Sequence, residues 1–255
     1  MGAHWTDAYY GALYLDSVED LLTPTLSALE AEVVAVLLRL GPTDRVLDLA
    51  CGHGRHAIPL APRVRSLCGL DRSAGYLARA ARAAAAAQGA RPPVLVRGDL
   101  RALPFRPGAF DALYSWYSSL FVFDDPGNEA ALAGAAAVVR PGGRLLVHHA
   151  NPLWLAADPE ASAERTLADG SRVEERSRWD AARGVDVSSR RIIRPGGAVL
   201  AATAELRYYM PSEWGRLADR AGLRLVAVTS TPGAATLREP GPQDPDLVAL
   251  LETPA

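Results

Sequence analysis

The sequence is poor in the features that mark secreted, membrane-bound and nucleic-acid-binding proteins. Only two of its 255 residues are cysteines, Cys51 and Cys68, and both stand in or beside the ends of expected strands, so we expect free thiols and a reducing cytoplasm. No basic-then-apolar signal segment opens the chain and no apolar run reaches about eighteen residues, so neither secretion nor a membrane span is expected. The basic residues are spread along the chain and the net charge is −2, so we expect no nucleic-acid partner. The length suits one large α/β domain. Together, the free thiols and the lack of a signal segment and of a long apolar run lead us to expect a soluble cytoplasmic protein.

The most informative segment is residues 46–57, Val-Leu-Asp-Leu-Ala-Cys-Gly-His-Gly-Arg-His-Ala. An apolar strand breaks into a turn of small residues and then re-enters as a helix, so the backbone and the free N–H groups of the helix start can approach a ligand closely. Asp48 stands at the end of this strand, and Asp71 stands at the end of the next apolar strand, a spacing that suits a carboxylate binding ribose hydroxyls. The glycines also fit the G-x-G-x-x-A form of a dinucleotide fingerprint, so an NAD-type oxidoreductase is an alternative at this point.

Three later segments extend the pattern. They are Gly-Asp-Leu-Arg-Ala-Leu-Pro-Phe at 98–105, Phe-Asp-Ala-Leu-Tyr-Ser at 110–115, and a helix that leads into Val-Arg-Pro-Gly-Gly at 139–143. With the first segment, and in this order from about residue 40 to 150, they resemble the class I S-adenosylmethionine (SAM) dependent methyltransferases. One departure is Ala50, where the family often has glycine. A Rossmann dehydrogenase usually has the first of these strands very near its N-terminus, whereas residues 1–44 precede it here, which favours the methyltransferase interpretation.

Strand and helix patterns alternate along most of the chain, which predicts a Rossmann-like doubly wound α/β sheet. The expected strands are 45–49, 65–70, 93–98, 110–115, 143–150, 223–230 and 246–252. The expected helices are 54–62, 73–88, 126–140 with Asp125 as its N-cap and Pro141-Gly142-Gly143 as its end, and 211–222. The resemblance implies seven strands in the order 3-2-1-4-5-7-6, with the last strand antiparallel.

A different pattern follows the fifth strand. Three consecutive strand patterns, 172–180, 184–194 and 198–209, predict an antiparallel β insert. In the family such an insert walls the acceptor pocket or makes oligomer contacts. We therefore expect an N-terminal aromatic segment with helices that cap the cofactor site (1–40) and a methyltransferase domain (41–255) that carries the insert at 165–210.

The resemblance implies SAM as the cofactor, with S-adenosylhomocysteine as its product, bound beyond the carboxyl ends of the strands. The residues expected around the methionine moiety and its methyl group are Asp48, Ala50, Gly52, Gly54, Ser115 and Trp116. Arg55 either binds the methionine carboxylate or covers the helix surface.

The nucleoside moiety is expected at the ends of the second and third strands. Asp71 is expected to bind the ribose hydroxyls, with Arg72 alongside the adenine. Asp99 and Leu100 are expected at the adenine edge, where Asp99 would accept from the amino group.

Candidate acceptor groups follow the fourth and fifth strands. Tyr117, a candidate catalytic residue, and Ser119, a candidate substrate contact, come directly after the fourth strand. Adjacent strand residues point to opposite faces, so at most one of His148 and His149 faces the pocket. We expect His149, nearer the strand end, to act as a general base, with a hydrogen-bonded structural histidine as the alternative.

Three tyrosines outside these strands are further candidates for substrate contact. Tyr10 and Tyr14 either form a lid over the cofactor or pack within an N-terminal helix. Tyr208, at the end of the insert, is expected to line the pocket.

A metal is not expected. His53 and His56 bracket the turn whose backbone the cofactor needs, and no companion cluster of cysteine or glutamate accompanies them. Asp124 and Asp125 could hold magnesium, but a helix cap explains Asp125 without an ion.

The sequence therefore predicts a SAM-dependent methyltransferase that acts on a small-molecule N or O nucleophile. The alternatives are a SAM-binding protein without methyl transfer, cyclase-like or regulatory, and an NAD-type oxidoreductase. The expected partners are the small-molecule acceptor and, through the β insert, a second copy of the chain, with no membrane.

Overall fold

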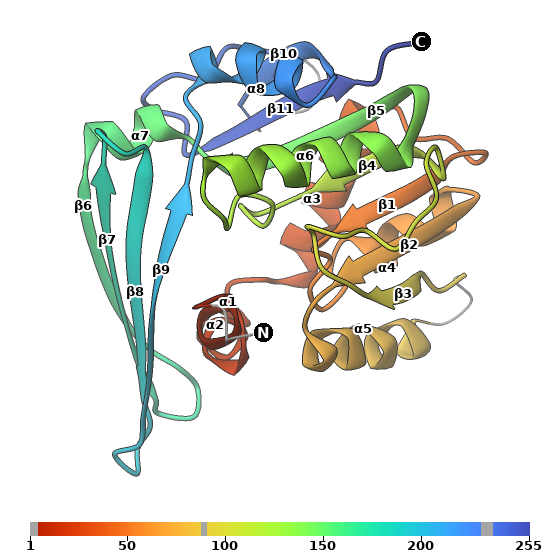
Figure 1. Ribbon diagram of the computed structural model, residues 1–255. Coiled ribbons are helices and arrows are strands. Elements are labelled where there is room, and N and C mark those ends of the chain that lie inside the picture. Colours follow the sequence, from red (N-terminus) through yellow and green to blue (C-terminus); the bar gives the residue numbers. More distant parts are fainter. Residues whose placement is uncertain (1–4, 88–90, 231–236) are drawn as a thin grey trace.

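A twisted sheet of seven strands forms the centre of the fold (Figure 1). The computed structural model describes residues 5–87, 91–230 and 237–255. The strands are β1 (Arg45–Leu49), β2 (Ser66–Asp71), β3 (Val94–Arg97), β4 (Phe110–Ser115), β5 (Val139–Ala150), β10 (Arg224–Thr229) and β11 (Asp246–Glu252). Their order is β10-β11-β5-β4-β1-β2-β3, and β11 runs antiparallel to both of its neighbours. The expected order 3-2-1-4-5-7-6 is confirmed.

Helices cover both faces of this sheet. On one face lie α6 (Asp125–Val138) and α8 (Trp214–Arg220), the latter preceded by the 3₁₀ turn η2 (Pro211–Glu213). On the other lie α3 (Pro24–Leu37) and α4 (Ala57–Leu60), which continues into the 3₁₀ turn η1 (Ala61–Arg63), with α5 (Ala74–Ala86) beside α4. Strand alternation sets these faces: Leu47 and Leu49 join the α6 side, whereas Val46 joins the α3 side.

Side-chain caps fix where the helices begin. The N–H of Leu26 donates to Thr23 Oγ1 at the start of α3, and the N–H of Tyr76 donates to Ser73 Oγ at the start of α5. At the start of α6 the cap is Asp124, whose Oδ1 accepts from the N–H of Gly127 at 3.0 Å. The expectation that Asp125 is this cap is wrong by one residue, because Asp125 is already helical.

The far end of α6 also differs from expectation. The helix ends at Val138, and β5 begins at Val139, so Pro141-Gly142-Gly143 lies within the extended segment rather than at the helix end. Val139 has extended backbone angles (φ −94°, ψ 137°), so the chain leaves the helix before it reaches the proline.

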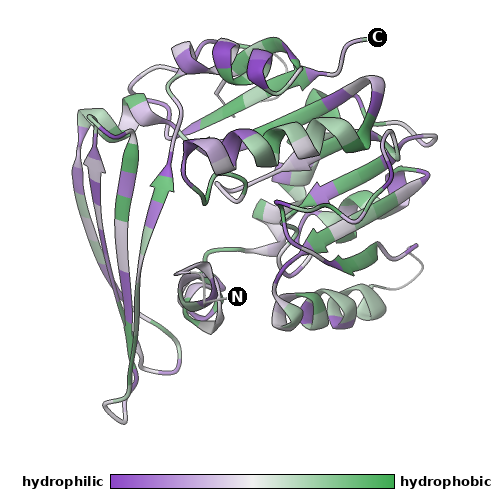
Figure 2. Ribbon diagram, in the orientation of Figure 1, coloured by the Kyte–Doolittle hydropathy of each residue, from purple (hydrophilic) through white to green (hydrophobic). Residues whose placement is uncertain are grey.

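The insert is a second, four-stranded antiparallel sheet that stands apart from the central sheet (Figure 1). After α7 (Pro152–Ala157) it runs through β6 (Glu160–Thr166), β7 (Arg172–Asp180), β8 (Val185–Ile193) and β9 (Val199–Arg207) in sequential order. The three expected strands are present. Strand β6, which reads Glu-Ala-Ser-Ala-Glu-Arg-Thr, has no large apolar residue to announce a strand. Figure 2 shows that the insert is more hydrophilic than the central strands.

Two short N-terminal helices lie between the insert and the central sheet (Figure 1). They are α1 (Trp5–Tyr9) and α2 (Ala12–Val18). Tyr9 packs in a cluster with Trp179 and Leu206 of the insert. Leu13 packs with apolar residues of β7 and β8, and Arg194 pairs with Asp16 at 2.8 Å. The helices therefore rest on the insert, 150 residues and more away in sequence.

Cys51 and Cys68 are both free. In the described part of the chain, no helix is long and apolar enough to cross a membrane.

Candidate active site

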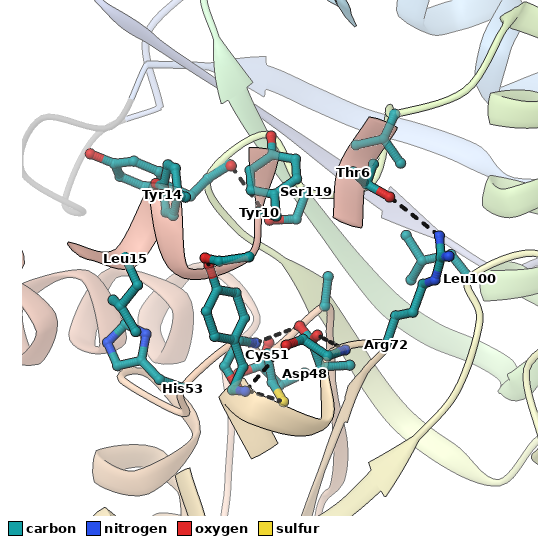
Figure 3. Close-up of a pocket in the computed structure, with 18 of the residues that line it drawn as sticks. Thr6, Tyr10, Tyr14, Leu15, Asp48, Cys51, His53, Arg72, Leu100 and Ser119 are labelled. Atoms are coloured by element: carbon teal, nitrogen blue, oxygen red, sulfur yellow. Dashed lines mark hydrogen bonds between the residues drawn. The ribbon is translucent and has the colours of Figure 1, made fainter. Parts of the chain in front are cut away.

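A cavity of about 440 Å³ opens at the carboxyl ends of β1, β2 and β4 and is roofed by α1 and α2 (Figure 3). Figure 3 shows Asp48 and Cys51 on one side of this cavity and Tyr10 and Tyr14 on the other. The volume is in the range of small-molecule sites. The position is where open α/β sheets bind ligands.

The turn after β1 forms the floor. Ala50 and Gly52 line the cavity and have left-handed backbones, with φ of +65° and +54°. This left-handed conformation is unfavourable for alanine because of its Cβ. Such backbone strain is concentrated at functional sites.

Gly54 has a different role from the one expected. It is not among the described residues that line the cavity, and a Cβ built there would come within 3.1 Å of the Cβ of Ala80 on α5. With a φ of +80°, Gly54 lets the turn pack closely against α5 instead of touching a ligand.

Asp71 anchors the turn from the neighbouring strand. Its Oδ2 accepts from the N–H of Gly52 and its Oδ1 accepts from the N–H of Ser73, both at 2.8 Å. Burial raises the pKa of Asp71, although these two backbone hydrogen bonds oppose the rise. A carboxylate oxygen has two lone-pair sites, so both oxygens retain acceptor capacity toward the cavity.

Asp48 is a buried carboxylate that also lines the cavity. Burial raises its pKa to about 7, and a hydrogen bond of 2.8 Å from the hydroxyl of Tyr114 opposes that rise only in part. A cation that binds beside such a buried acid stabilises its ionised form.

Arg55 is held by a residue outside the recognised motifs. Its Nη1 forms an ion pair with Glu30 of α3, which also contacts His56 Nε2 at 3.0 Å and Trp116 Nε1 at 3.4 Å. Burial would raise the pKa of Glu30, but the hydrogen bonds of His56 and Arg55 outweigh it and lower that pKa to about 2. The Nη2 of Arg55 is buried and has no hydrogen-bond partner among the described residues. One donor of Arg55 therefore remains for a ligand, such as a carboxylate.

The residues expected near the adenine all line the cavity. Arg72 pairs with Asp7 at 2.8 Å and contacts Thr6 Oγ1 at 3.3 Å, which ties α1 to the end of β2 (Figure 3). Asp99 pairs with Arg101 at 2.6 Å, and that hydrogen-bonded pair lowers the pKa of Asp99 to about 2. Leu100 stands next to Asp99 and adds an apolar surface.

The segment after β4 forms another part of the wall. Trp116, Tyr117 and Ser119 all line the cavity. Ser115 does not: its side chain is fully buried, on the same side of the strand as Leu113, and we withdraw it from the cofactor site.

The structure places His149 away from the cavity. Its ring is fully buried on the α6 and α8 face, where it stacks with Trp214 and Tyr208 at 5.6 Å each. Nδ1 lies 2.7 Å from the carbonyl of Ala150, and burial lowers the pKa of His149 to about 3. A neutral, enclosed imidazole cannot exchange protons with an acceptor in the cavity. His148, the neighbour that we expected to face away, lies on the cavity face against Trp116 at 4.3 Å.

Tyr208 also lies away from its expected place at the cavity. It is buried between His149 and Trp179 and is absent from the described cavity lining. None of the insert strands, which are described in full, lines the cavity. The insert contacts the N-terminal helices, and these helices and the turn between them contribute Tyr10 and Tyr14 to the cavity lining.

Several cavity residues lie outside the patterns that the sequence offered. Tyr76 is an example, and its hydroxyl donates to the carbonyl of Gly11 at 2.9 Å. Glu30 does not line the cavity but holds Arg55, which does. A lone glutamate or tyrosine in a helix carries no motif, so the only signal is the tertiary contact.

No group of three or more histidine, cysteine, aspartate or glutamate side chains within residues 5–87, 91–230 and 237–255 could hold a metal ion. Asp125 accepts from the hydroxyl of Tyr209 at 2.9 Å and from Arg207 Nε at 3.0 Å, so protein donors occupy it.

Comparisons with known proteins place this site in a family context. Residues 46–143 match the family model described as a methyltransferase domain. The chain is 39% identical over 110 residues to a demethylmenaquinone methyltransferase of Mycolicibacterium vanbaalenii, which covers 43% of each protein, so the match spans less than half the length of that curated relative.

Solved structures share the whole architecture. The CcbJ methyltransferase from Streptomyces caelestis superposes with a TM-score of 0.75 at 24% identity, covering 90% of both chains. The sugar N-methyltransferase KedS8 from Streptoalloteichus superposes with a TM-score of 0.67 at 19% identity over 90% of this chain and 88% of that one. Streptomyces venezuelae DesVI superposes with a TM-score of 0.64 at 22% identity over the full length of both. At these identities the likeness shows the fold.

Proposed function

We propose that this chain, which carries a class I methyltransferase domain, transfers the methyl group of SAM to an amine of a small molecule and releases S-adenosylhomocysteine. The observation that carries the proposal is the cavity of about 440 Å³ between the Ala50–Gly54 turn and the N-terminal helices. The carboxylates of Asp48 and Asp71 and the unpartnered Nη2 of Arg55 belong to residues that line this one cavity, and this grouping supports the proposal.

The donor set suits the charges of SAM. We assign the ribose hydroxyls to Asp71 and the adenine edge to Asp99 and Leu100. The amino-acid end of the cofactor carries a cation and an anion, which complement Asp48 and the buried Nη2 of Arg55. When bound, the cofactor supplies an activated methyl group on a sulfonium.

The acceptor side supports an amine over an alcohol. Burial raises the pKa of Tyr10, Tyr14 and Tyr117, so these phenols stay neutral near pH 7 and serve as hydrogen-bonding and aromatic surfaces. An amine can enter with a free lone pair, whereas an alcohol needs a base. Two structural neighbours are named as a sugar N-methyltransferase and a glycopeptide N-methyltransferase.

In this proposal the chain works by alignment and by exclusion of water. Tyr117 and Ser119 orient the acceptor with their hydroxyl groups, and Tyr10 and Tyr14 close the cavity over it. Trp116, with 5% of its surface exposed, keeps the wall next to the reacting groups dry.

We further propose cytoplasmic action and a homo-oligomer formed through the insert, whose edge strand β6 offers unpaired backbone groups. Light scattering of the purified protein, compared with a β6 variant that carries a proline at Ala163, tests the second statement. A monomer in both samples would contradict it.

The decisive experiment is an acceptor screen. The protein is incubated with SAM and a panel of aminosugars, other amines, phenols, alcohols and quinols, and S-adenosylhomocysteine is measured. We expect turnover with amines and a thermal shift with SAM but not with NAD. Stabilisation by NAD alone would favour an oxidoreductase, and SAM binding without turnover on any member would favour a non-transferring protein.

A further inference from the structure

Two residues after β4 have backbone angles that residues with a Cβ rarely adopt. Tyr117 has a φ of +64° and Ser118 a φ of +59°, and neither is a glycine. Two consecutive left-handed residues persist only where the surroundings hold them. The contacts that stabilise these two residues also shape the cavity, because Tyr117 lines it.

The hold comes from β5, and chiefly from His148. The N–H of Tyr117 donates to His148 Nδ1 at 3.1 Å, and the N–H of Ser118 donates to the carbonyl of His148 at 3.0 Å. The N–H of Ala150 donates to Ser118 Oγ at 3.3 Å. One histidine therefore receives a hydrogen bond from each of the two strained residues.

The imidazole ring also supports the side chains of this turn. It stacks on Trp116 with ring centroids 4.3 Å apart and planes at 18°, and on Tyr117 at 6.1 Å and 10°. His148 is 4% exposed and lies behind the cavity wall rather than in it. Its role is thus to hold the residues that face the ligand.

The tautomer of His148 follows from its neighbours. Because Nδ1 accepts from a backbone N–H, the proton lies on Nε2, which is 3.5 Å from Oδ1 of Asp246 on the adjacent strand β11. The carboxylate favours this tautomer and fixes the ring plane.

We propose that His148 is a positioning residue that holds the Trp116–Ser118 turn as the acceptor-facing wall of the cavity. The proposal rests on the function proposed above. The proposed cofactor contacts of Asp71 and Asp48 come from other strands, so loss of the turn should change acceptor binding more than SAM affinity.

Two substitutions separate the two functions of the ring. His148→Phe retains an aromatic ring that can stack on Trp116 but removes the acceptor for the N–H of Tyr117. His148→Asn removes the ring but offers an amide oxygen near the position of Nδ1. His149→Phe is the matched control, since it introduces the same ring one residue later on the opposite face. His148→Leu replaces the Phe variant if that variant does not fold.

The first readout needs no turnover. Amide hydrogen exchange of Tyr117 is measured by NMR or in a peptide that spans residues 115–119. We expect exchange about tenfold faster in His148→Phe than in wild type, and within about threefold of wild type in His148→Asn and in His149→Phe. Unchanged exchange in His148→Phe would overturn the proposal.

The second readout is the split between cofactor and acceptor. We expect the acceptor KM to rise about tenfold in His148→Phe, with the Kd for SAM within about threefold of wild type, and His148→Asn to restore the KM. Faster exchange with an unchanged KM would show that the turn is not the acceptor wall. If the wild type methylates no amine, the proposed function fails, whereas the exchange data still decide whether His148 holds the turn.

Discussion

The two sides of the cavity are built in different ways. On the cofactor side, Asp48, Asp71 and the Ala50–Gly54 turn stand within a few residues of buried parallel strands. On the lid side, α1 and α2 span five and seven residues, and the N-cap of α2 makes no side-chain hydrogen bond. Helices this short are not stable alone, so the lid depends on distant contacts. One side is specified by local sequence and the other by the tertiary structure.

The largest expected effect concerns Asp48 and the dependence of stability on pH. Its folded pKa of about 7 lies above the unfolded value, so the native state binds the extra proton and the free energy of unfolding falls as pH rises from about 4 to 7. The full shift corresponds to about 4 kcal/mol. We expect Asp48→Asn to remove this slope and to be more stable than wild type at pH 8, while it binds SAM more weakly.

Urea unfolding of both proteins at pH 5 and pH 8 measures this effect. The difference in the free energy of unfolding between the two proteins isolates the contribution of Asp48. Paired acids such as Glu30, whose pKa is lowered, make stability rise with pH and contribute equally to both proteins. Parallel pH profiles would show that Asp48 does not carry the uncompensated charge of the cofactor side.

Asp71→Ala tests whether the cofactor side acts separately. Removing the carboxylate leaves the N–H groups of Gly52 and Ser73 without their acceptor. It also removes the proposed ribose contact. We expect the Kd for SAM to rise about tenfold to a hundredfold, because a charge-assisted pair of hydrogen bonds contributes about 1.5–3 kcal/mol. Asp99→Ala should have a smaller effect, because Asp99 is paired with Arg101 and more exposed. Calorimetric titration with SAM decides, and an effect confined to the acceptor KM would remove the distinction between the two sides.

Arg190→Met tests the lid side in the same way. The guanidinium of Arg190 on β8 lies 4.9 Å from the ring centre of Tyr14 and 5.5 Å from that of Tyr9. Loss of these cation–π contacts should raise the acceptor KM about fivefold and leave the Kd for SAM nearly unchanged. Arg191→Met is the control, since Arg191 is the next residue on the strand, is exposed and pairs with Glu174. Equal effects of both variants would mean that the insert does not support the lid through Arg190.

The smallest effect is expected for Ala50→Gly. Ala50 has a φ of +65°, which glycine adopts without the penalty of a Cβ, so the variant should gain up to about 1 kcal/mol in the free energy of unfolding. Gly52→Ala is the reciprocal change. Among the described residues, a Cβ there meets only Tyr76 Cδ2 at 3.9 Å, so we expect any loss of stability to come from its φ of +54°. Chemical denaturation of both variants measures these differences, and a destabilised Ala50→Gly protein would contradict the strain argument.

The difference between the two sides of the cavity also explains which parts of the structure could be predicted from the sequence. The central strands follow from local patterns, and their order follows from the resemblance to the methyltransferase family. The expected residues Asp48, Ala50, Gly52, Asp71, Asp99 and Trp116 stand in motifs of local spacing, and the structure places all six at the cavity. Strand β6 was missed because its residues are polar or small.

The errors at His149 and Ser115 have a common cause. The alternation of side chains along a strand predicts that adjacent residues face opposite sides of the sheet, but it does not predict which side holds the cavity. That choice is made by the packing of α6 and α8 against one face, where Trp214 encloses His149. Glu30 was missed because it reaches Arg55 from a helix 25 residues earlier.

The ion pair between Asp16 and Arg194 joins residues 178 positions apart, and it has a consequence for the order of folding. Helices α1 and α2 leave the ribosome before the insert does, yet the sheet on which they rest is complete only when β9 has been made. Closing so long a loop is slow compared with forming contacts between neighbouring strands. We therefore expect α1 and α2 to be among the last elements to reach their native positions, and the floor of the cavity to form before its roof.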